Sequence, residues 1–452
     1  MWQKMCNLAQ FFGRGHSFLS YGIMEKLMHY VWKHRLWGSN SLSTNDGVPI
    51  RVIDTGLPNT DSGPDFFNAK VEIGGKLWVG NVEIHVRASD WKRHGHDHDK
   101  AYDNVILHVV EKDDAPVYRT GGERIPQMVM RCSPQFHERY DHLVNSLSEI
   151  PCTPQISQVP SLVITEWIEA LAFERLHGKV SRLRKLLEAY NGSWEDVCYV
   201  TLSRNLGFGI NNDALERLAR LTPVRLLHKH SDSLLQVEAL LFGQAGLLAA
   251  DKAIDDPYFA QLQREYDFLA RKFSLSPIEA ESWKMFRIRP QNFPYKRIAL
   301  LAQFITGGFR LMAQILDANG NEKALRELFS AKLSGYWANH FSFGEPSATS
   351  SQALSNRSID IILINTVAPL YYAYGELTDN YEMTDCAIGL LEQLKPEKNS
   401  IVERFAFAGI PCDDALTSQA LIQLKREYCD AKKCIYCKIG HRLLSQAAVE
   451  RE

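Results

Sequence analysis

Strand-like and helix-like patterns occupy separate parts of this 452-residue sequence. Short runs rich in Val, Ile and aromatic residues, each bounded by Gly, Pro or Asp, occur between residues 48 and 131: VPIRVIDTG, DFFNAKVEI, KLWVGNVEIHV, NVILHVV and IPQMVM. Such runs predict β-strands. From residue 162 onward the apolar residues recur at helical spacing without strand-like alternation. The sequence therefore predicts an α+β fold, in which a mostly antiparallel sheet near the N-terminus precedes a large all-helical domain.

Domain boundaries follow from the same patterns. We expect residues 1–23 to be a disordered extension outside the fold, because a regular helical pattern begins only at Met24. An α/β core is predicted at 24–150. The three prolines of PCTPQISQVPS, residues 151–161, predict a linker, and the helical domain is predicted at 160–452.

The composition restricts the classes of protein to which the chain could belong. With 45% hydrophobic and 23% charged residues, it is typical of a soluble globular protein. A net charge of −2 excludes a global attraction to nucleic acid or acidic membranes, so such affinity requires a local patch. No apolar run of about 18 residues occurs, and a transmembrane span is not expected. The nine cysteines lack the spacing of a secreted disulfide framework, which predicts a cytoplasmic location.

Two predicted strands joined by Gly74-Gly75 bring acidic and histidine side chains together. The apolar alternation changes parity at Gly80-Asn81, which indicates a β-bulge. Beyond it, Glu83 and His85 share the face opposite the core. The short turn places Asp65 near this pair, because opposed strand positions lie about 5 Å apart. Such a group can bind Mg²⁺ or Mn²⁺ and so activate water beside a phosphate. The alternative is an ordinary solvated strand face.

Five of the 15 histidines lie close together in the sequence, namely His85, His94, His96, His98 and His108. If residues 94–98 formed a strand, their three histidines would share a face and could bind Zn²⁺, Fe²⁺ or Mn²⁺. On a helix the three would fan out and could not converge. Gly95 and the polar composition favour a loop, so metal ligation and a structural or solvent-exposed role both stay open. His108 alternates with apolar residues, which predicts a hydrogen-bonded histidine facing the core.

Residues 24–131 resemble the core of the PD-(D/E)XK nuclease superfamily. The resemblance rests on GPDF at 63–66, a hairpin, VEIH at 82–85, a helical stretch and then VILHVV. It implies that Asp65 and Glu83 hold a metal ion and that Ile84 is the spacer of the motif.

One position departs from the superfamily pattern. His85 stands where the superfamily has a lysine that orients or deprotonates water, and histidine can act as a base or ligand near pH 7. Lys70 on the partner strand could substitute for that lysine. By the same resemblance, Glu25 on the preceding helix could correspond to the acidic residue of the superfamily's helix. The sequence as a whole also resembles an uncharacterised bacterial family of unknown function.

Four cysteines near the C-terminus form the pattern C-x16-C-x4-C-x2-C: Cys412, Cys429, Cys434 and Cys437. Four thiolates can bind Zn²⁺ or a [4Fe–4S] cluster, and C-x2-C is a common chelating pair. The irregular spacing resembles the iron–sulfur sites of some RecB-like nucleases and DNA glycosylases more than a zinc ribbon. Plain reduced thiols are the alternative, and His441 could replace Cys412 as the fourth ligand.

Two basic segments indicate a nucleic-acid partner. The first surrounds the cysteines and contains Lys425, Arg426, Lys432, Lys433, Lys438 and Arg442. It could contact phosphates, and on charge alone a solvated helix face is an equal alternative. The second, FRIRPQNFPYKRIALLA at 286–302, interleaves basic and aromatic residues, as single-stranded nucleic-acid binding sites do. For the second segment we favour the alternative that its prolines simply mark the turn before a helix.

These observations predict a metal-dependent nuclease-like hydrolase acting on DNA or RNA. In this hypothesis Asp65 and Glu83 bind the ion and His85 lies near the attacking water. A non-enzymatic alternative is a nucleic-acid-binding or scaffold protein with a degenerate core. A third hypothesis is a histidine-based metal hydrolase or oxygenase acting on a small molecule, for which a metal at His94, His96 and His98 would be the sign.

Overall fold

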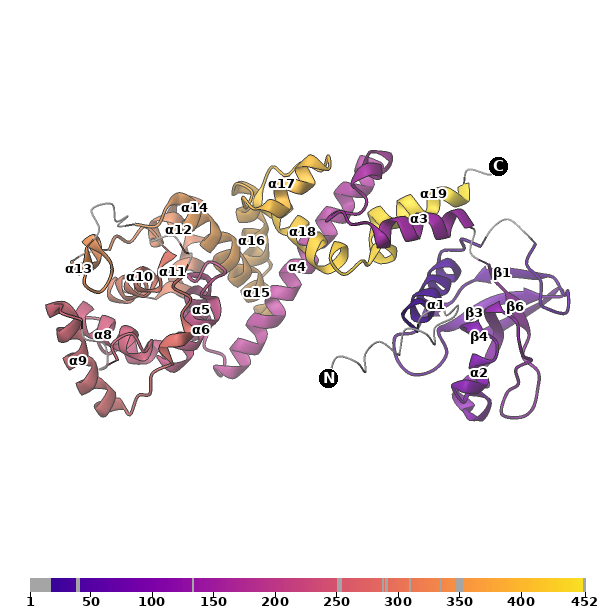
Figure 1. The fold of residues 1–452 in the computed structure, drawn as a ribbon, viewed down its shortest axis with the longest axis horizontal. Coiled ribbons are helices and arrows are strands. Elements are labelled where there is room, and N and C mark those ends of the chain that lie inside the picture. The colour runs from indigo at the N-terminus through magenta and orange to yellow at the C-terminus, as the bar shows by residue number, and fades with distance from the viewer. Residues whose placement is uncertain are drawn as a thin grey trace, which may run out of the picture. The chain divides into compact units, whose positions relative to one another are not determined.

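The computed structural model describes residues 18–37, 41–131, 134–249, 254–286, 288, 292–308, 310–333, 335–346 and 353–449 (Figure 1). The chain forms two compact units, one of residues 1–164 with 427–452 and the other of residues 165–426. The predicted boundary near residue 160 therefore lies close to the observed division. The C-terminal segment differs from the prediction, because it belongs to the first unit and not to the helical one.

The first unit combines a sheet with helices and short 3₁₀-helical turns, which carry the label η. Its elements are α1 (Phe18–Lys33), β1 (Ile50–Asp54), β2 (Leu57–Pro58), β3 (Phe66–Ile73), β4 (Lys76–Arg87), α2 (Asp90–Arg93), η1 (His96–His98), η2 (Lys100–Tyr102), β5 (Val105–Lys112), β6 (Gln127–Val129), α3 (Pro134–Asn145), η3 (Thr153–Gln158), η8 (Cys434–Tyr436) and α19 (Lys438–Val449). Helix α4 (Ser161–Ala189) and the π-helical turn η7 (Leu424–Cys429) cross the division between the units. Helix α1 begins before Met24, and residues 1–17 of the predicted extension lie outside the described residues.

The sheet has the order β1-β3-β4-β5-β6, and β2 also pairs with β3. Strands β1, β3 and β4 pair antiparallel, whereas β4, β5 and β6 pair parallel, so the sheet is mixed. The predicted tight turn is confirmed by the pairing of Ile73 with Lys76. The predicted bulge is confirmed by a register shift between Asn81 and Val82.

Strand β4 separates two apolar clusters. On one face, Val82, Ile84 and Val86 are buried in a core that also contains residues of α1, α3 and α19. Figure 1 shows α1 beside the sheet, which it contacts along β4. On the other face a smaller cluster includes Trp91 of α2 and Tyr102 of η2. The alternate residues of β4 therefore point into a second, covered layer.

The second unit is largely helical, and one continuous apolar core runs through it. Besides α4 it contains α5 (Trp194–Asn205), α6 (Asn212–Leu221), α7 (Val224–His228), α8 (Leu234–Gln244), α9 (Pro257–Phe273), η4 (Ala280–Ser282), α10 (Pro294–Thr306), α11 (Leu311–Ala318), α12 (Glu322–Leu328), α13 (Tyr336–Asn339), β7 (His340–Ser342), β8 (Glu345–Pro346), α14 (Asn356–Ile362), the π-helical turn η6 (Leu363–Val367), α15 (Ala368–Thr378), α16 (Tyr381–Gln393), α17 (Ser400–Phe407) and α18 (Ala415–Gln423). The pair β7–β8 corrects the prediction of an all-helical domain.

Pro294 begins α10 as its first helical residue, which confirms the preferred interpretation of the second basic segment. Lys296 and Arg297 are buried. Lys296 donates to the carbonyl oxygen of Trp337 at 2.6 Å, and the guanidinium of Arg297 lies 4.3 Å from the ring centre of Phe208. These two cations therefore stabilise the helical unit and do not form a surface for nucleic acid.

Glu238 of α8 is a buried carboxyl in the core of the helical unit. Its side chain is 1% exposed, and its Oε2 accepts hydrogen bonds from Tyr258 Oη at 2.5 Å and Trp337 Nε1 at 3.0 Å. Burial raises the pKa of Glu238 to about 7, although the two hydrogen bonds oppose the shift. The protonated carboxyl is therefore the form that this site favours.

The raised pKa of Glu238 predicts a pH-dependent stability. Between the ordinary value of 4.5 and about 7 the folded state binds more protons than the unfolded state, so the unfolding free energy falls as pH rises. A shift of this size corresponds to at most about 3 kcal/mol. Glu238→Gln should flatten this fall in urea unfolding curves recorded at pH 5 and pH 8. Parallel pH dependences in the wild type and the variant would show that the carboxyl does not titrate as described.

Within the described residues, no single helix is both long and apolar enough to cross a membrane. Helices α10 and α11 reach the required length and composition only together, as a pair bent by 76°.

Candidate metal centre

Alternation along β4 places Glu83 and His85 on the same face of the sheet. Their side chains are 6% and 3% exposed, and His85 Nε2 lies 3.5 Å from Glu83 Oε1. The shared face was predicted from the sequence, and it is confirmed. The alternative of a solvated strand face is wrong, because α2, η1 and η2 cover it.

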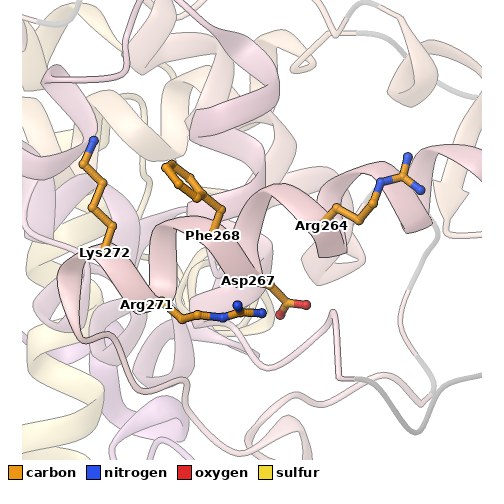
Figure 2. A pocket seen from close by; sticks show the side chains of 5 residues that line it. All are labelled: Arg264, Asp267, Phe268, Arg271 and Lys272. Atoms are coloured by element: carbon orange, nitrogen blue, oxygen red, sulfur yellow. The ribbon is translucent and has the colours of Figure 1, made fainter.

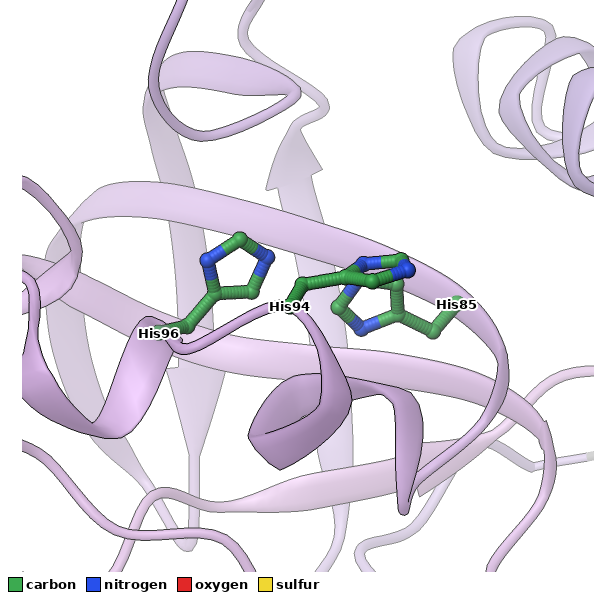
Figure 3. A group of neighbouring side chains, drawn as sticks. All are labelled: His85, His94 and His96. Atoms are coloured by element: carbon green, nitrogen blue, oxygen red, sulfur yellow. The ribbon is translucent and has the colours of Figure 1, made fainter.

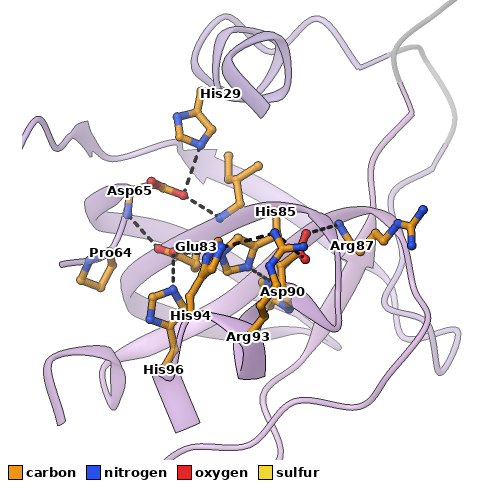
Figure 4. A network of polar contacts seen from close by, with 12 residues as sticks. His29, Pro64, Asp65, Glu83, His85, Arg87, Asp90, Arg93, His94 and His96 are labelled. Carbon is orange, nitrogen blue, oxygen red and sulfur yellow. Dashed lines mark hydrogen bonds and ion pairs between the residues drawn. The ribbon is translucent and has the colours of Figure 1, made fainter. Parts of the chain in front are cut away.

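Asp65, directly before β3, is tied to Glu83 through the backbone. Its N–H donates to Glu83 Oε2 at 3.0 Å, and its carboxylate Oδ2 accepts from the N–H of Ile84 at 2.9 Å (Figure 4). The same Oδ2 lies 3.2 Å from His29 Nε2 on α1. The predicted proximity of Asp65 and Glu83 is therefore confirmed, and these contacts fix the orientation of both carboxylates.

The three imidazoles of His85, His94 and His96 lie close together (Figure 3). One ring nitrogen from each of His85, His94 and His96 lies within 4.8 Å of the others, a spacing that could hold a metal ion. His94 Nδ1 is 3.2 Å from His85 Nε2, and His96 Nε2 is 3.3 Å from Glu83 Oε1. These four residues, Glu83, His85, His94 and His96, are called the histidine–glutamate cluster below.

The histidine–glutamate cluster omits His98, which was predicted as a metal ligand. Its side chain is 85% exposed and lies 3.5 Å from Asp97. The reason is local backbone structure. His94 ends α2, Gly95 takes the left-handed conformation with φ of 77°, and residues 96–98 form the 3₁₀ turn η1. Residues 94, 96 and 98 therefore do not share a face. His94, although exposed, approaches His85, and His96 is buried beside Glu83.

His108 supports the cluster from the neighbouring strand β5. Glu83 and His108 are paired in register, and His108 Nε2 lies 2.9 Å from His85 Nδ1. The ring of Trp91 lies 5.2 Å from that of His108 and 5.3 Å from that of His96. The prediction that His108 faces the interior and is hydrogen-bonded is confirmed. A partner on one ring nitrogen fixes the imidazole orientation and leaves the other nitrogen for a ligand role.

Burial controls the protonation of the site. Burial raises the pKa of Glu83, and the nearby Asp65 carboxylate raises it further. Burial lowers the pKa of His85 far below its usual range, with neighbouring imidazoles acting in the same direction, and lowers that of His108 to about 3. Neutral imidazole is the form that binds a metal ion. The site is therefore suited to receive a cation, whose charge would allow Glu83 to ionise.

His29 is a functional candidate that the sequence analysis missed. It lies one helical turn after Glu25, so both side chains extend from the same side of α1. Burial lowers the pKa of His29, but the hydrogen bond and charge of Asp65, together with the charges of Glu25 and Glu83, outweigh burial, so the net shift is upward. Glu25 has a raised pKa, from burial first and also from the charge of Asp65. The spacing Glu25-x3-His29 was the available signal.

Lys70 does not join this group of contacts. Its side chain is exposed, and the residue pairs in register with Asp54 and Val79, whereas Glu83 lies further along β4, beyond the bulge at Asn81–Val82. The structure therefore gives no support to Lys70 as a substitute for the superfamily's lysine.

The predicted C-terminal cysteines divide between the two units. Cys429, Cys434 and Cys437 belong to the first unit, whereas Cys412 belongs to the helical unit, where its thiol lies 3.7 Å from the carbonyl oxygen of Asp414. His441 Nδ1 lies 2.5 Å from the hydroxyl of Tyr30. The structure thus favours neither Cys412 nor His441 as the partner of the other three cysteines.

A basic face with an exposed aromatic ring runs along α9 and was also missed. Arg264, Phe268, Arg271 and Lys272 follow helical spacing and, with Asp267, line an open pocket (Figure 2). The Phe268 ring is 60% exposed. In the first basic segment, by contrast, Lys425 is buried.

The fold and the site define an α+β protein with a candidate metal centre of three histidines beside Glu83, formed by strand β4 and the segment that follows it. The chain belongs to a family of proteins of unknown function, DUF2851, whose family model matches residues 25–400. No curated protein and no solved structure matches the chain.

Proposed function

We propose that this protein is a metal-dependent hydrolase that cleaves phosphodiester bonds in DNA or RNA. The observation that carries the proposal is the histidine–glutamate cluster, in which one carboxylate oxygen stands 3.5 Å and 3.3 Å from two imidazoles on a covered sheet face. The strand order supports the same proposal. Asp65 precedes β3 and Glu83 lies on β4, and these two strands form an antiparallel hairpin. Helix α2 follows, and β5 then pairs parallel with β4, which is the order that the nuclease resemblance implies.

The donor set favours a transition metal over Mg²⁺. Mg²⁺ prefers an octahedral shell of oxygen ligands, whereas imidazole nitrogen suits Zn²⁺, Fe²⁺ and Mn²⁺. Three of the four side chains in the histidine–glutamate cluster offer nitrogen. Mn²⁺ accepts both nitrogen and carboxylate oxygen, so we propose Mn²⁺ as the first ion to test.

The residues around the cluster have separable roles in this proposal. A bound ion would supply activated water and would neutralise charge on the scissile phosphate. Asp65 holds Glu83 in place through its backbone N–H. His29, paired with Asp65 and 31% exposed, is placed to exchange a proton with solvent or a leaving group. Arg93 is 58% exposed and lies 3.4 Å from His94, where it could contact a phosphate oxygen.

The test is cleavage by the full-length protein. Metal-stripped protein is supplied with Mn²⁺, Zn²⁺ or Mg²⁺ and incubated with single- and double-stranded DNA and RNA. We expect strand cleavage that needs the added transition metal and that disappears in His85→Ala. Binding without cleavage under all of these conditions would instead support a scaffold with a degenerate core.

A histidine-based hydrolase acting on a small molecule is the second candidate. The closeness of His94 and His96 to His85 favours it, because the ligand set is richer in histidine than the nuclease pattern implies. Cleavage of small chromogenic phosphoesters, with no action on any nucleic acid, would identify this alternative.

The basic face of α9 supports the proposed nucleic-acid partner. An exposed aromatic ring beside arginine and lysine side chains is the arrangement that stacks on unpaired bases. If Phe268 stacks on one base, Phe268→Ala should weaken binding of single-stranded DNA or RNA by about 1–3 kcal/mol, or roughly 5- to 150-fold in Kd. Fluorescence anisotropy with a labelled oligonucleotide measures this change.

The matched control for this surface is Phe407→Ala, which removes a ring that is 90% exposed on α17. Equal losses of affinity in the Phe268 and Phe407 variants would show that α9 is not the binding face. A Phe268 variant with unchanged affinity would show the same.

A further inference from the structure

We propose that Cys152, Cys429, Cys434 and Cys437 together form a four-thiolate site for Zn²⁺ or a [4Fe–4S] cluster. All four belong to the first unit, although more than half of the chain separates Cys152 from the other three. This site differs from the set expected from the sequence, because Cys152 takes the place of Cys412. The proposal stands independently of the proposed hydrolase activity.

Four cysteines line one pocket in the first unit. Its lining contains Cys152, Cys429, Cys434 and Cys437, together with Leu143, Pro151, Tyr428 and Gly440. Cys437 is 8% exposed, and the other three cysteines are half-buried. Four soft sulfur donors are the ligands that structural zinc sites and iron–sulfur clusters use.

The backbone shapes the C-terminal half of this pocket around Cys434 and Cys437. Residues 434–436 form η8, and the N–H of Cys437 donates to the carbonyl oxygen of Cys434 at 3.3 Å. Such a turn brings the two thiols of a C-x2-C pair to one side. A Cβ at Gly440 would lie 2.2 Å from the Cys434 carbonyl oxygen. Helix α19 can therefore pack this close to the backbone of Cys434 only because residue 440 is glycine.

The surroundings favour thiolates once a cation is present. The N–H of His441 donates to the carbonyl oxygen of Cys437 at 2.7 Å, which places Cys437 at the start of α19, where the helix dipole stabilises negative charge. A bound cation would stabilise the thiolate forms further through direct bonds to sulfur.

A metal bound at this site would link the C-terminal segment to the N-terminal part of the first unit. Cys152 lies between α3 and η3, whereas Cys434 and Cys437 flank the start of α19. Helices α3 and α19 already contact each other, and Lys432 Nζ donates to the carbonyl oxygen of Ser146 at 2.8 Å. A metal bond between these segments would close a very long chain loop that contains the helical unit.

The test uses full-length protein purified without oxygen, with iron, acid-labile sulfide and zinc measured per chain. We expect either one zinc ion or one cluster, and the iron and sulfide contents distinguish the two. Cys152→Ser should lose most of this metal, whereas the matched variant Cys412→Ser should keep it. The opposite pattern, or wild-type protein without zinc, iron and sulfide, would overturn the proposal.

Thiol alkylation of the wild-type protein is a second test, which does not depend on the folding of a variant. Mass spectrometry should find Cys152, Cys429, Cys434 and Cys437 protected together while metal is bound. All four should become reactive together when a chelator removes zinc or an oxidant destroys the cluster. Rapid alkylation of Cys152 with the metal still bound would contradict its role as a ligand.

Discussion

Glu83→Gln is expected to reduce metal-dependent phosphodiester hydrolysis by roughly 10³-fold, because a metal ion contributes several kcal/mol of transition-state stabilisation. Glutamine keeps an oxygen that can accept the N–H of Asp65, so the loop before β3 should retain its position. It removes the carboxyl group beside His85 and His96 that would become negatively charged when a cation binds. Initial rates with a nucleic-acid substrate, measured across a range of Mn²⁺ concentrations, provide the comparison.

Glu72→Gln is the matched control for this prediction. Glu72 lies on β3 of the same sheet and pairs with Arg51. Its substitution changes the same functional group without touching the histidine–glutamate cluster, so its rate should stay close to that of the wild type. A Glu83 variant with wild-type rates at every Mn²⁺ concentration would remove Glu83 from the reaction.

Replacing His94 and His96 together with alanine should weaken binding of Mn²⁺ or Zn²⁺ by at least about 100-fold, because even residues that only orient metal ligands can contribute 10- to 100-fold. The loss is expected because the two side chains supply two of the three clustered ring nitrogens. Competition with a chromogenic chelator measures the affinity directly and does not depend on any assumption about substrate.

His98→Ala is the corresponding control, since the His98 imidazole is 85% exposed and contacts Asp97. Its metal affinity should match that of the wild type. If His98→Ala weakened metal binding as much as the double substitution, the ligands would have to be reassigned.

The β-hairpin was predictable because strand geometry is periodic. Once the parity switch at Gly80-Asn81 located the bulge, the faces of Glu83 and His85 followed from alternation alone. Neighbouring strands then placed Asp65 near Glu83, and the structure confirms this proximity. What alternation could not predict was the burial of that face, because the covering segment of α2, η1 and η2 has no regular period.

The orientations of the histidines at residues 94–98 could not be predicted from residue spacing either. The orientation of His94, His96 and His98 depends on a left-handed Gly95 and a single 3₁₀ turn, and residue spacing does not encode either of these. His29 was not predicted because its partner, Asp65, lies on a different element and is distant in sequence.

Contacts between distant segments were the least predictable feature of the fold. The cysteines near the C-terminus suggested a site made from residues close together in sequence, so Cys412 was included and Cys152 was not considered. In the structure the C-terminal segment returns to the first unit, where Ile435 and Leu444 join the core with α1 and β4. Apolar periodicity identifies α19 as a helix but does not specify the core to which it belongs.

The most direct test of the proposed metal centre is anomalous scattering from crystals of the full-length protein grown with Mn²⁺. The proposed site predicts one manganese peak within coordination distance of Glu83 Oε1 and of one ring nitrogen each from His85, His94 and His96. Crystals that contain Mn²⁺ elsewhere, with these four side chains bonded only to one another, would contradict it.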